Sequence, residues 1–311
     1  MTNQHIQTCK ELLAAFQNNP QTSNPEKLRF TNDDHKDIYN ITAPFKDDGK
    51  GTIAGRVESR DSEESEVHFF TEENGVWKQK KDTPIFKLQD PFVTKIAGEL
   101  IFGGVETFSH PTKKYSLGWR TILMKGSTIA NLKQFAIGPV GMKDIRLVEL
   151  LDGSIGMFTR PQGEKGGRGK IGFKRLSSID KITVDEIENT PLLENQFVDN
   201  EWGGVNEAQV LSNGKVGVLG HVARFDKQKN RHYYPMVFMI DPETGYYSDM
   251  KIIATRANFQ KGPCKRADLQ DVVFSGGLIR KPNKTADLYA GISDVEAQKI
   301  TIPDPFFQYE T

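Results

Sequence analysis

The sequence lacks the features that would assign it to several common classes of protein. Its 311 residues include only two cysteines, Cys9 and Cys264, which are too few for a disulfide framework and fit a reducing compartment. No apolar run approaches the roughly eighteen residues that a membrane-spanning helix needs. The 41 basic and 41 acidic residues cancel, so there is no global positive field for nucleic acid. We therefore expect a soluble, cytoplasmic protein that binds neither nucleic acid nor membrane.

Motifs for metal, nucleotide and nucleophilic chemistry are also missing. The six histidines are scattered without ligand spacing, and the two cysteines lie far apart. No G-x-S-x-G motif occurs. The glycine-rich stretch 161–173 departs from a P-loop because Glu164 and Ile171 occupy positions that require glycine and a hydroxyl residue. We expect no metal and no bound cofactor, and we interpret 161–173 as either a mobile solvated loop or a lid.

Long helices are scarce as well. One short amphipathic helix is expected near the N-terminus, opened by a capping box in which Glu11 follows Thr8 by three residues. Beyond residue 30, short alternating or apolar segments recur between Gly, Asn and Asp, which is typical of strands and turns. We assign residues 1–26 to an N-terminal helical extension and 27–311 to one all-β catalytic domain.

The chain does contain a weak internal repeat. In each copy a polar residue opens a strand, a turn follows and a second strand leads away; the five starts are Asn40, Asp90, Asp144, Asn206 and Asp271. Tight-hairpin signals occur at Asp48-Gly49, Asp152-Gly153 and Asn213-Gly214. The spacing between successive starts suits a four-stranded blade. We therefore predict a five-bladed β-propeller closed by a strand near 27–31. A two-sheet sandwich would explain the strands but not the repeated polar starts.

In a propeller the first strand of each blade lines the central axis, so the polar starts should meet at one end of the channel. Asp90 is conspicuous because it precedes Pro91 and an apolar strand, where it acts either in turn chemistry or in catalysis. A funnel of carboxylates and amides suits a sugar, which needs many hydrogen-bond partners. The candidate substrate-binding residues are Asp144, Asn206, Glu207, Asp271 and Trp202. Trp202 would either stack on a sugar face or fill a gap between blades.

Basic and aromatic residues follow the same strand starts. Their spacing from the inner strands places them at a channel mouth, where cations could hold an oxyanion. The candidates are Arg146, Arg160, Arg168, His221, Tyr234, Lys265 and Arg266.

Several of these segments resemble one known family. QDPFVTKI, GELIFGGVETF, KDIRLVEL, WGGVNEAQVL and ADLQDVVFSGGL resemble a family first catalogued as a domain of unknown function and associated with mannosyltransferase/phosphorylase enzymes of β-1,2-linked mannose oligomers. The resemblance runs from about residue 35 to 305. The family is similar in architecture to the five-bladed β-mannoside phosphorylases. The resemblance implies inverting chemistry on mannosides, with phosphate or a nucleotide sugar as the other reactant, and it matches Asp90 in QDPF to a single general acid or base.

The composition of the expected site favours phosphorolysis over hydrolysis. An inverting hydrolase needs a second carboxylate to activate water, whereas phosphate is already a nucleophile and needs cations to hold it. We therefore expect an enzyme that uses inorganic phosphate as co-substrate and interconverts β-1,2-mannosides and α-mannose 1-phosphate. A homo-oligomer is left open as its assembly state. The alternatives are a sugar-nucleotide-dependent β-mannosyltransferase and a non-catalytic carbohydrate-binding propeller in which Asp90 caps a strand.

Overall fold

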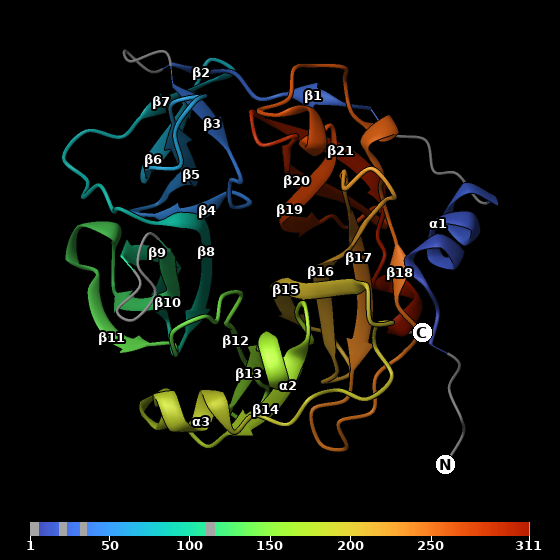
Figure 1. Cartoon of the computed structure of the whole chain (residues 1–311). Helices are drawn as coiled ribbons and strands as arrows, with labels where there is room; N and C mark the ends of the chain where they lie inside the picture. The colour runs from blue at the N-terminus through green and yellow to red at the C-terminus, as the bar shows by residue number, and fades with distance from the viewer. Residues whose placement is uncertain (1–5, 19–23, 32–35, 110–115, 311) are drawn as a thin grey trace.

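The computed structural model describes residues 6–18, 24–31, 36–109 and 116–310. Antiparallel sheets are arranged around a common centre, and β4, β8, β12, β15 and β19 are the strands nearest to it (Figure 1). The mainly β composition and the radial arrangement agree with a propeller-like fold, as the repeated strand starts predicted. Within these residues, no helix is long and apolar enough to cross a membrane.

The first two sheets follow the chain in order. The first has the order β2-β7-β6-β5-β3, with β4 also paired to β5; its strands are β2 (Phe30–Thr31), β3 (Asp37–Tyr39), β4 (Phe45–Asp47), β5 (Lys50–Glu58), β6 (Ser65–Glu73) and β7 (Val76–Gln79). The second has the order β11-β10-β9-β8; its strands are β8 (Gln89–Ile96), β9 (Glu99–Ser109), β10 (Leu117–Gly126) and β11 (Lys133–Ile137).

The third sheet is the smallest of those described. It contains β12 (Arg146–Glu149), β13 (Ile155–Thr159) and β14 (Gly172–Leu176). Two short helices belong to the same region, α2 (Gly163–Gly166) and α3 (Val184–Glu188). The helix α2 falls in the glycine-rich stretch 161–173. This stretch contacts the next sheet, where the Gly203 N–H donates a hydrogen bond to the Gly169 carbonyl (3.2 Å).

The eight-stranded sheet combines two antiparallel parts. One part has β15 (Glu201–Val210), β16 (Val216–Phe225), β17 (Arg231–Ile240) and β18 (Lys251–Ile252). The other has β19 (Asp271–Arg280), β20 (Thr285–Ile292), β21 (Glu296–Pro303) and β1 (Glu26–Lys27). A short parallel pairing of β17 with β19 joins them.

The segment 26–31 links the two ends of the chain. Its β1 pairs with β21 of the last sheet, while β2 pairs with β7 of the first. The predicted closing strand near 27–31 is therefore divided into two short strands, one on each side of the junction.

Apolar cores lie between neighbouring sheets rather than at the ring centre. Among the described residues, four clusters combine side chains of adjacent sheets, as when Phe102 of β9 packs with Phe69 of β6. A fifth lies between the two antiparallel parts of the eight-stranded sheet. Burial of apolar surface at these contacts is the main stabilising term. The centre is left to polar side chains.

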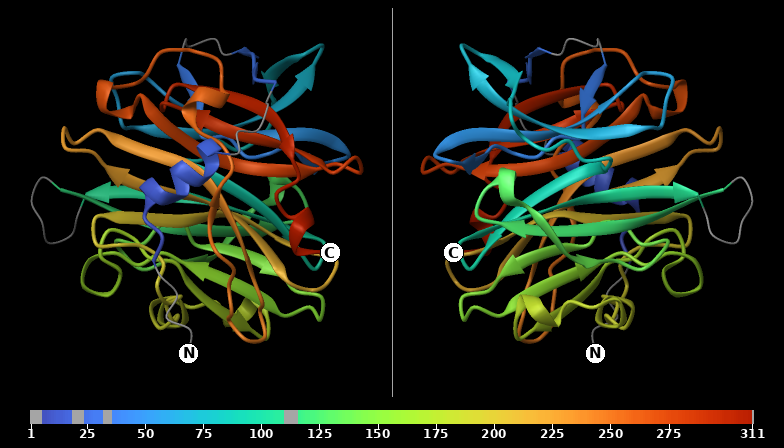
Figure 2. Two further views of the ribbon diagram at one scale, coloured as in Figure 1. Left: turned by 90° about the vertical axis from the view of Figure 1, so that its right-hand side faces the viewer. Right: turned by 90° about the vertical axis from the view of Figure 1, so that its left-hand side faces the viewer.

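The N-terminal helix α1 (Cys9–Asn18) forms as predicted. Thr8 N–H donates to Glu11 Oε2 (2.8 Å) and Glu11 N–H donates to Thr8 Oγ1 (3.2 Å), which is the reciprocal capping box. The helix lies on the outside of the ring (Figure 2), where Cys9 and Leu12 pack in the same cluster as Ile252 of β18.

The inner strands are interrupted by irregular positions at a similar depth in the ring. Asn40, Asp90 and Asp144 adopt positive φ values of 43°, 49° and 60°. The register of β15 shifts between Val205 and Glu207, and that of β19 between Ser275 and Gly277. Bulges re-aim side chains and often occur beside active sites. We call this level the bulge ring, defined by Asn40, Asp90, Asp144, Asn206 and Gly276.

Candidate functional site

Asp90 is a buried carboxylate held by residues of the first sheet and of the segment that precedes β12. The residue is 5% exposed to solvent. Oδ1 accepts hydrogen bonds from Asn40 Nδ2 (2.8 Å) and Arg56 Nη1 (3.2 Å). Oδ2 lies 4.0 Å from Lys143 Nζ, and no described residue donates a hydrogen bond to it. One oxygen is therefore fixed in place while the other is available to a ligand.

The charge state of Asp90 follows from these neighbours. Burial alone would raise its pKa, but the Arg56 and Lys143 charges and the Asn40 hydrogen bond outweigh burial and hold the pKa below its ordinary value. Asp90 is thus ionised at neutral pH in the ligand-free protein.

Asp144 is the second buried carboxylate of the bulge ring, in a residue only 1% exposed. Its Oδ2 lies 3.2 Å from Arg160 Nη1 and its Oδ1 lies 3.9 Å from Arg146 Nη2. Burial would raise its pKa, but these cations and Lys143 lower the pKa to about 2. Arg160 Nε also donates to the carbonyl of Gly203 (2.8 Å), which fixes the guanidinium beside Asp144.

Gly204 shows how tightly the site is packed. A Cβ added to this residue would lie 2.8 Å from Arg160 Cδ, 2.8 Å from Asp144 Oδ2 and 2.9 Å from His221 Cε1. Only a glycine lets β15 approach these three side chains so closely. His221 is 1% exposed, and its Nδ1 is 2.9 Å from Asn206 Oδ1. Burial lowers the pKa of His221 to about 3, so the imidazole is neutral.

Several buried polar atoms of the bulge ring lack a hydrogen-bond partner among the described residues. They are Asn40 Oδ1, Asp144 Oδ1 and Asn206 Nδ2. Asp144 Oδ2 and Arg160 Nη1, beside the ring, have only their ion pair with each other (3.2 Å). A buried polar atom without a partner costs about 1–3 kcal/mol, so such atoms are rare in native proteins. Their clustering at one level indicates a site whose hydrogen bonds are completed by a ligand.

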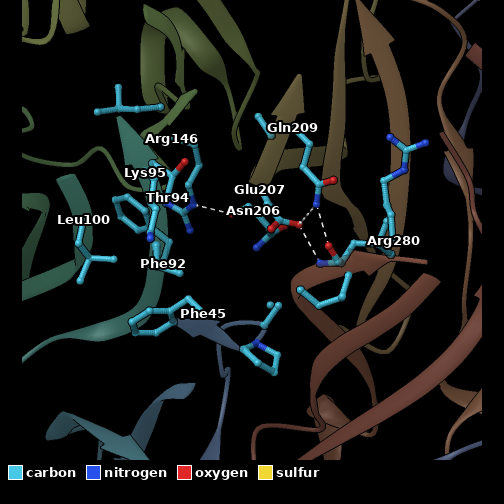
Figure 3. Close-up of a pocket in the computed structure, with 18 of the residues that line it drawn as sticks. Phe45, Phe92, Thr94, Lys95, Leu100, Arg146, Asn206, Glu207, Gln209 and Arg280 are labelled. Atoms are coloured by element: carbon cyan, nitrogen blue, oxygen red, sulfur yellow. Dashed lines mark hydrogen bonds between the residues drawn. The ribbon is translucent and has the colours of Figure 1, made fainter. Parts of the chain in front are cut away.

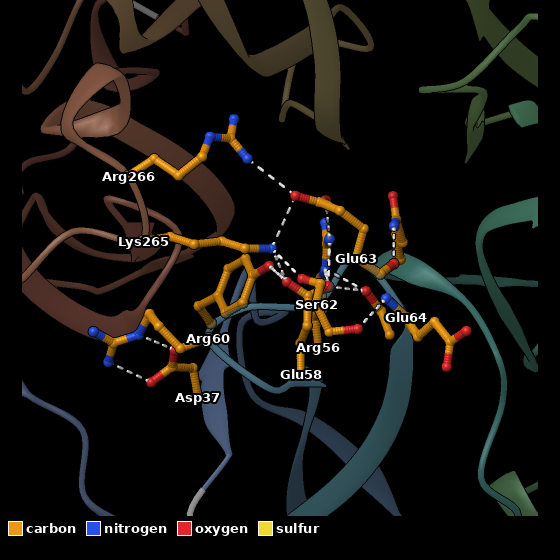
Figure 4. Close-up of polar contacts among 12 residues, drawn as sticks. Asp37, Arg56, Glu58, Arg60, Ser62, Glu63, Glu64, Lys265 and Arg266 are labelled. Carbon is orange, nitrogen blue, oxygen red and sulfur yellow. Dashed lines mark hydrogen bonds and ion pairs between the residues drawn. The ribbon is translucent and has the colours of Figure 1, made fainter. Parts of the chain in front are cut away.

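Lys265 and Arg266 lie outside this centre, in a network of ion pairs (Figure 4). Lys265 Nζ pairs with Glu58 and lies 3.1 Å from Glu63 Oε1, which is itself 3.0 Å from Arg266 Nη1. Glu58 in turn pairs with Arg56 (2.7 Å), the residue that holds Asp90. The two predicted phosphate-binding residues are therefore neutralised by carboxylates and connect to Asp90 only through Glu58 and Arg56.

Asp271 and Tyr234 contact each other rather than the bulge ring. Tyr234 Oη donates to Asp271 Oδ2 (2.7 Å), which is also 2.6 Å from His232 Nδ1. The irregular position of β19 is at Ser275 to Gly277, so the repeat start at Asp271 is not the structural equivalent of Asp90. The predicted convergence of all five polar starts therefore holds for four of them and is wrong for Asp271.

Trp202 and Arg168 pack together at the edge of the site. Trp202 is 4% exposed, donates from Nε1 to Tyr233 Oη (3.0 Å) and packs on Phe225 with ring centroids 4.9 Å apart. Trp202 is therefore buried against aromatic residues of its own sheet. The exposed Arg168 places its guanidinium carbon 5.8 Å from the Trp202 ring centroid and 5.1 Å from that of Phe225.

Glu207 and Arg146 lie on the far side of the bulge ring. Glu207 Oε2 accepts from Leu278 N–H (2.7 Å) and Gln209 Nε2 (3.1 Å), so it joins β15 to β19 (Figure 3). Arg146 is 4% exposed, donates from Nε to the Asn206 carbonyl (2.8 Å), and has its guanidinium carbon 4.0 Å from the Phe92 ring centroid.

Four residues of the site were missed by the sequence analysis. Asn40 was noted only as a strand start, while Arg56, Lys143 and Tyr233 were not considered as ligand-binding residues. Lys143 directly precedes Asp144, and Tyr233 stacks on His221 with centroids 5.4 Å apart. Strand alternation could have indicated Tyr233, because consecutive residues of a strand face opposite sides.

The chain is similar to one family model and to several solved structures. The model of a family described as protein of unknown function (DUF1861) matches residues 14–308. A mannose phosphorylase from Leishmania mexicana, solved with phosphate ion, is 36% identical, covers 97% of this chain and 95% of its own, and gives a TM-score of 0.89. A GDP-Man-dependent mannosyltransferase from the same organism is 30% identical, with coverages of 98% and 96% and a TM-score of 0.88.

More distant similarity extends to the fold alone. A β-1,2-mannobiose phosphorylase from Listeria innocua is 12% identical, with 92% of each chain covered and a TM-score of 0.59. No protein of curated function matches the chain significantly.

Proposed function

The chain belongs to the DUF1861 family, together with mannosyltransferase/phosphorylase enzymes, and on this premise we propose that it is an inverting phosphorylase of β-1,2-linked mannosides. The observation that carries the proposal is the pairing of one buried carboxylate that has a free oxygen, Asp90, with cations at the same level of the ring. Within the described part of the chain, no group of three His, Cys, Asp or Glu side chains is placed to hold a metal ion.

In the proposed reaction, Asp90 protonates the glycosidic oxygen, directly or through a hydroxyl group of the sugar. A phosphate oxygen attacks the anomeric carbon from the opposite face, the glycosidic bond breaks, and α-mannose 1-phosphate and a shortened mannoside leave. Lys143 and Arg160 would hold the phosphate, and Arg168 could reach it from the surface. Cations are needed here because the phosphate dianion otherwise repels Asp90.

The ionisation of Asp90 suits both directions of this reaction. In the ligand-free protein the carboxylate is ionised, which is the form that can accept a proton from an acceptor hydroxyl during synthesis. For phosphorolysis, an approaching phosphate dianion raises the pKa of Asp90 by like-charge repulsion, and sugar binding adds desolvation in the same direction.

The state of Asp144 favours phosphorolysis over hydrolysis. A hydrolase would need a carboxylate of moderate pKa to activate water, whereas Asp144 has a pKa of about 2 and is paired with Arg160. Asp294 is the competing candidate for that role, because burial raises its pKa to about 6 while Arg56 opposes the rise.

The test is incubation with β-1,2-mannobiose in the presence and absence of inorganic phosphate. We expect mannose 1-phosphate only when phosphate is supplied. Release of free mannose alone, at the same rate with and without phosphate, would contradict the proposal and indicate a hydrolase.

A second candidate function is favoured by the similarity to the GDP-Man-dependent mannosyltransferase. In that case the same Asp90 would act as base toward the acceptor, and a nucleotide would replace phosphate as the leaving group. Extension of a mannoside by GDP-mannose in phosphate-free buffer would identify this activity.

We further propose that the ring is a single five-bladed catalytic domain, residues 27–311, with 1–26 as its extension. Counting the two antiparallel parts of the eight-stranded sheet separately gives five units, and an apolar cluster separates each pair of neighbours.

A further inference from the structure

A cavity of about 560 Å³ lies next to the bulge ring (Figure 3), and Asn206 and Gly276 of the ring belong to its lining. Its walls are formed by the later parts of the inner strands, including Phe92–Lys95 of β8 and Asn206–Gln209 of β15. Neither Asp90 nor Asp144, Arg160 or His221 lines it. We call this space the distal cavity. Its size falls within the range of roughly 300–1,000 Å³ that is usual for small-molecule sites.

The charge of the distal cavity is positive. Lys46 and Lys95 line it as exposed residues, and within the described residues neither forms an ion pair. Arg146 adds a buried guanidinium, whose pKa is lowered to about 10 by burial despite the opposing charge of Asp144. Glu207 is the one acidic side chain in the described lining. Burial raises the pKa of Glu207 to about 7, so it is only partly ionised at neutral pH and offsets only part of this charge.

The inner end of the distal cavity offers an unused hydrogen-bond donor. Asn206 lines the cavity, is 4% exposed, and its Nδ2 donates to no group in the described part of the chain. Thr94 and Gln209 add further polar atoms, while Phe45 and Phe92 supply apolar walls (Figure 3). Polar groups combined with an aromatic surface are typical of sugar sites, because a sugar ring has hydroxyl groups at its edge and an apolar face.

We propose that the distal cavity binds a phosphate monoester of a hexose, with the phosphate at Lys46 and Lys95 and the sugar against Phe45 and Asn206. The unpaired lysines account for the anionic group, and the buried amide with the aromatic wall accounts for the sugar. This site is separate from the catalytic one, since Arg146 and Asn206 lie between the cavity and Asp144.

Isothermal titration calorimetry of the full chain with glucose 6-phosphate tests the proposal. This ester carries its phosphate on C6, so it is not the product of a phosphorolysis that places phosphate on C1. We expect binding to the wild type, and affinity at least about tenfold weaker in Lys46→Ala/Lys95→Ala, because both charge-assisted contacts to the phosphate are lost. The matched control is Lys81→Ala/Lys133→Ala, which removes two exposed lysines outside the cavity and should bind as the wild type does.

Two further titrations distinguish the possible sources of the phosphate group. Glucose without phosphate should bind far more weakly than the ester. Inorganic phosphate that binds as tightly as the ester, with the same loss in Lys46→Ala/Lys95→Ala, would identify free phosphate as the occupant of the same anion site. Unchanged ester affinity in that variant, equal affinity for glucose and its ester, or no binding of the ester to the wild type would overturn the proposal.

Discussion

Asn40 donates a hydrogen bond from Nδ2 to Oδ1 of Asp90 over 2.8 Å, although the two residues are 50 positions apart in the chain. The bond joins the first sheet to the second at the bulge ring and fixes one carboxylate oxygen of Asp90. Because the other oxygen has no described donor, the protein holds the carboxylate in a defined orientation while leaving one oxygen for proton transfer.

Replacement of Asp90 by asparagine should remove proton transfer while keeping the shape of the side chain. We expect the rate of mannose 1-phosphate release from β-1,2-mannobiose to fall by about 10²–10⁴-fold, the usual contribution of general acid catalysis. Thermal unfolding should show that Asp90→Asn remains folded. Full activity in the variant would mean that Asp90 only stabilises the strand start.

Asp294 distinguishes a phosphorylase from a hydrolase within the same site. Its φ of 55° is well tolerated by asparagine, so Asp294→Asn should preserve the backbone. If phosphate is the nucleophile, phosphorolysis should continue within a few-fold of the wild-type rate, because no base is needed to activate water. Loss of phosphate-dependent turnover comparable to that of Asp90→Asn would contradict this and would show that Asp294 takes part in phosphorolysis itself.

Arg160 and Asp144 form a buried pair, so removing one partner should cost more than removing both. Arg160→Met leaves the Asp144 carboxylate buried without its nearest cation, and we expect a loss of about 3–5 kcal/mol in the free energy of unfolding. The double variant Arg160→Met/Asp144→Asn should recover part of that loss. Urea unfolding of both single variants and the double variant checks this; strictly additive effects would show that the two charges do not interact.

The raised pKa of Glu207 predicts a pH dependence of stability. Its ordinary value is 4.5 and the folded value is about 7 because of burial. Between these values the folded protein binds more protons than the unfolded chain, so this group's contribution to the free energy of unfolding decreases as pH rises from 4.5 to 7. Glu207→Gln, whose Oε1 can still accept from Leu278, should therefore gain stability relative to the wild type at pH 8 but not at pH 5.

Urea unfolding at the two pH values measures the effect of Glu207→Gln. The control is Glu99→Gln, a substitution at an exposed residue of β9. A difference between wild type and Glu207→Gln that is the same at pH 5 and pH 8 would contradict the prediction.

Much of the arrangement could be predicted from local sequence signals. The capping box of Thr8 and Glu11, the hairpin turns and the mainly β composition are short-range features, each set by a few neighbouring residues. Four polar strand starts identified the bulge ring because Asn, Asp and their turn chemistry mark irregular backbone. In the last sheet that level carries Gly276 beside Ser275, so the sequence had no Asp or Asn to mark it, and the predicted repeat start, Asp271, lies five residues before Gly276.

The partners of the charged residues could not be predicted in the same way. Lys265 was expected at the mouth from its spacing, but its charge is neutralised by Glu58, which precedes it by 207 positions. Such pairs depend on how two sheets face each other, and the local pattern of either strand does not contain that information. Tyr234 was chosen in place of Tyr233 for a related reason: adjacent residues of a strand point to opposite faces, and a shift of one residue exchanges them.

Gly204 gives the most direct test of whether Asp144, Arg160 and His221 act as one site. Gly204→Ala would bring a methyl group within 2.8–2.9 Å of all three side chains, so at least two of them must move. We expect a rise in the KM for phosphate and a loss of activity, because displacement of about 1 Å can reduce a rate by roughly 10²-fold. The matched control is Gly51→Ala on β5, where an added Cβ meets nothing within 4 Å. If both variants bind phosphate as the wild type does, the cluster of Asp144, Arg160 and His221 around Gly204 has a structural role only. Phosphate would then be held by Lys143 and Arg168 without Arg160.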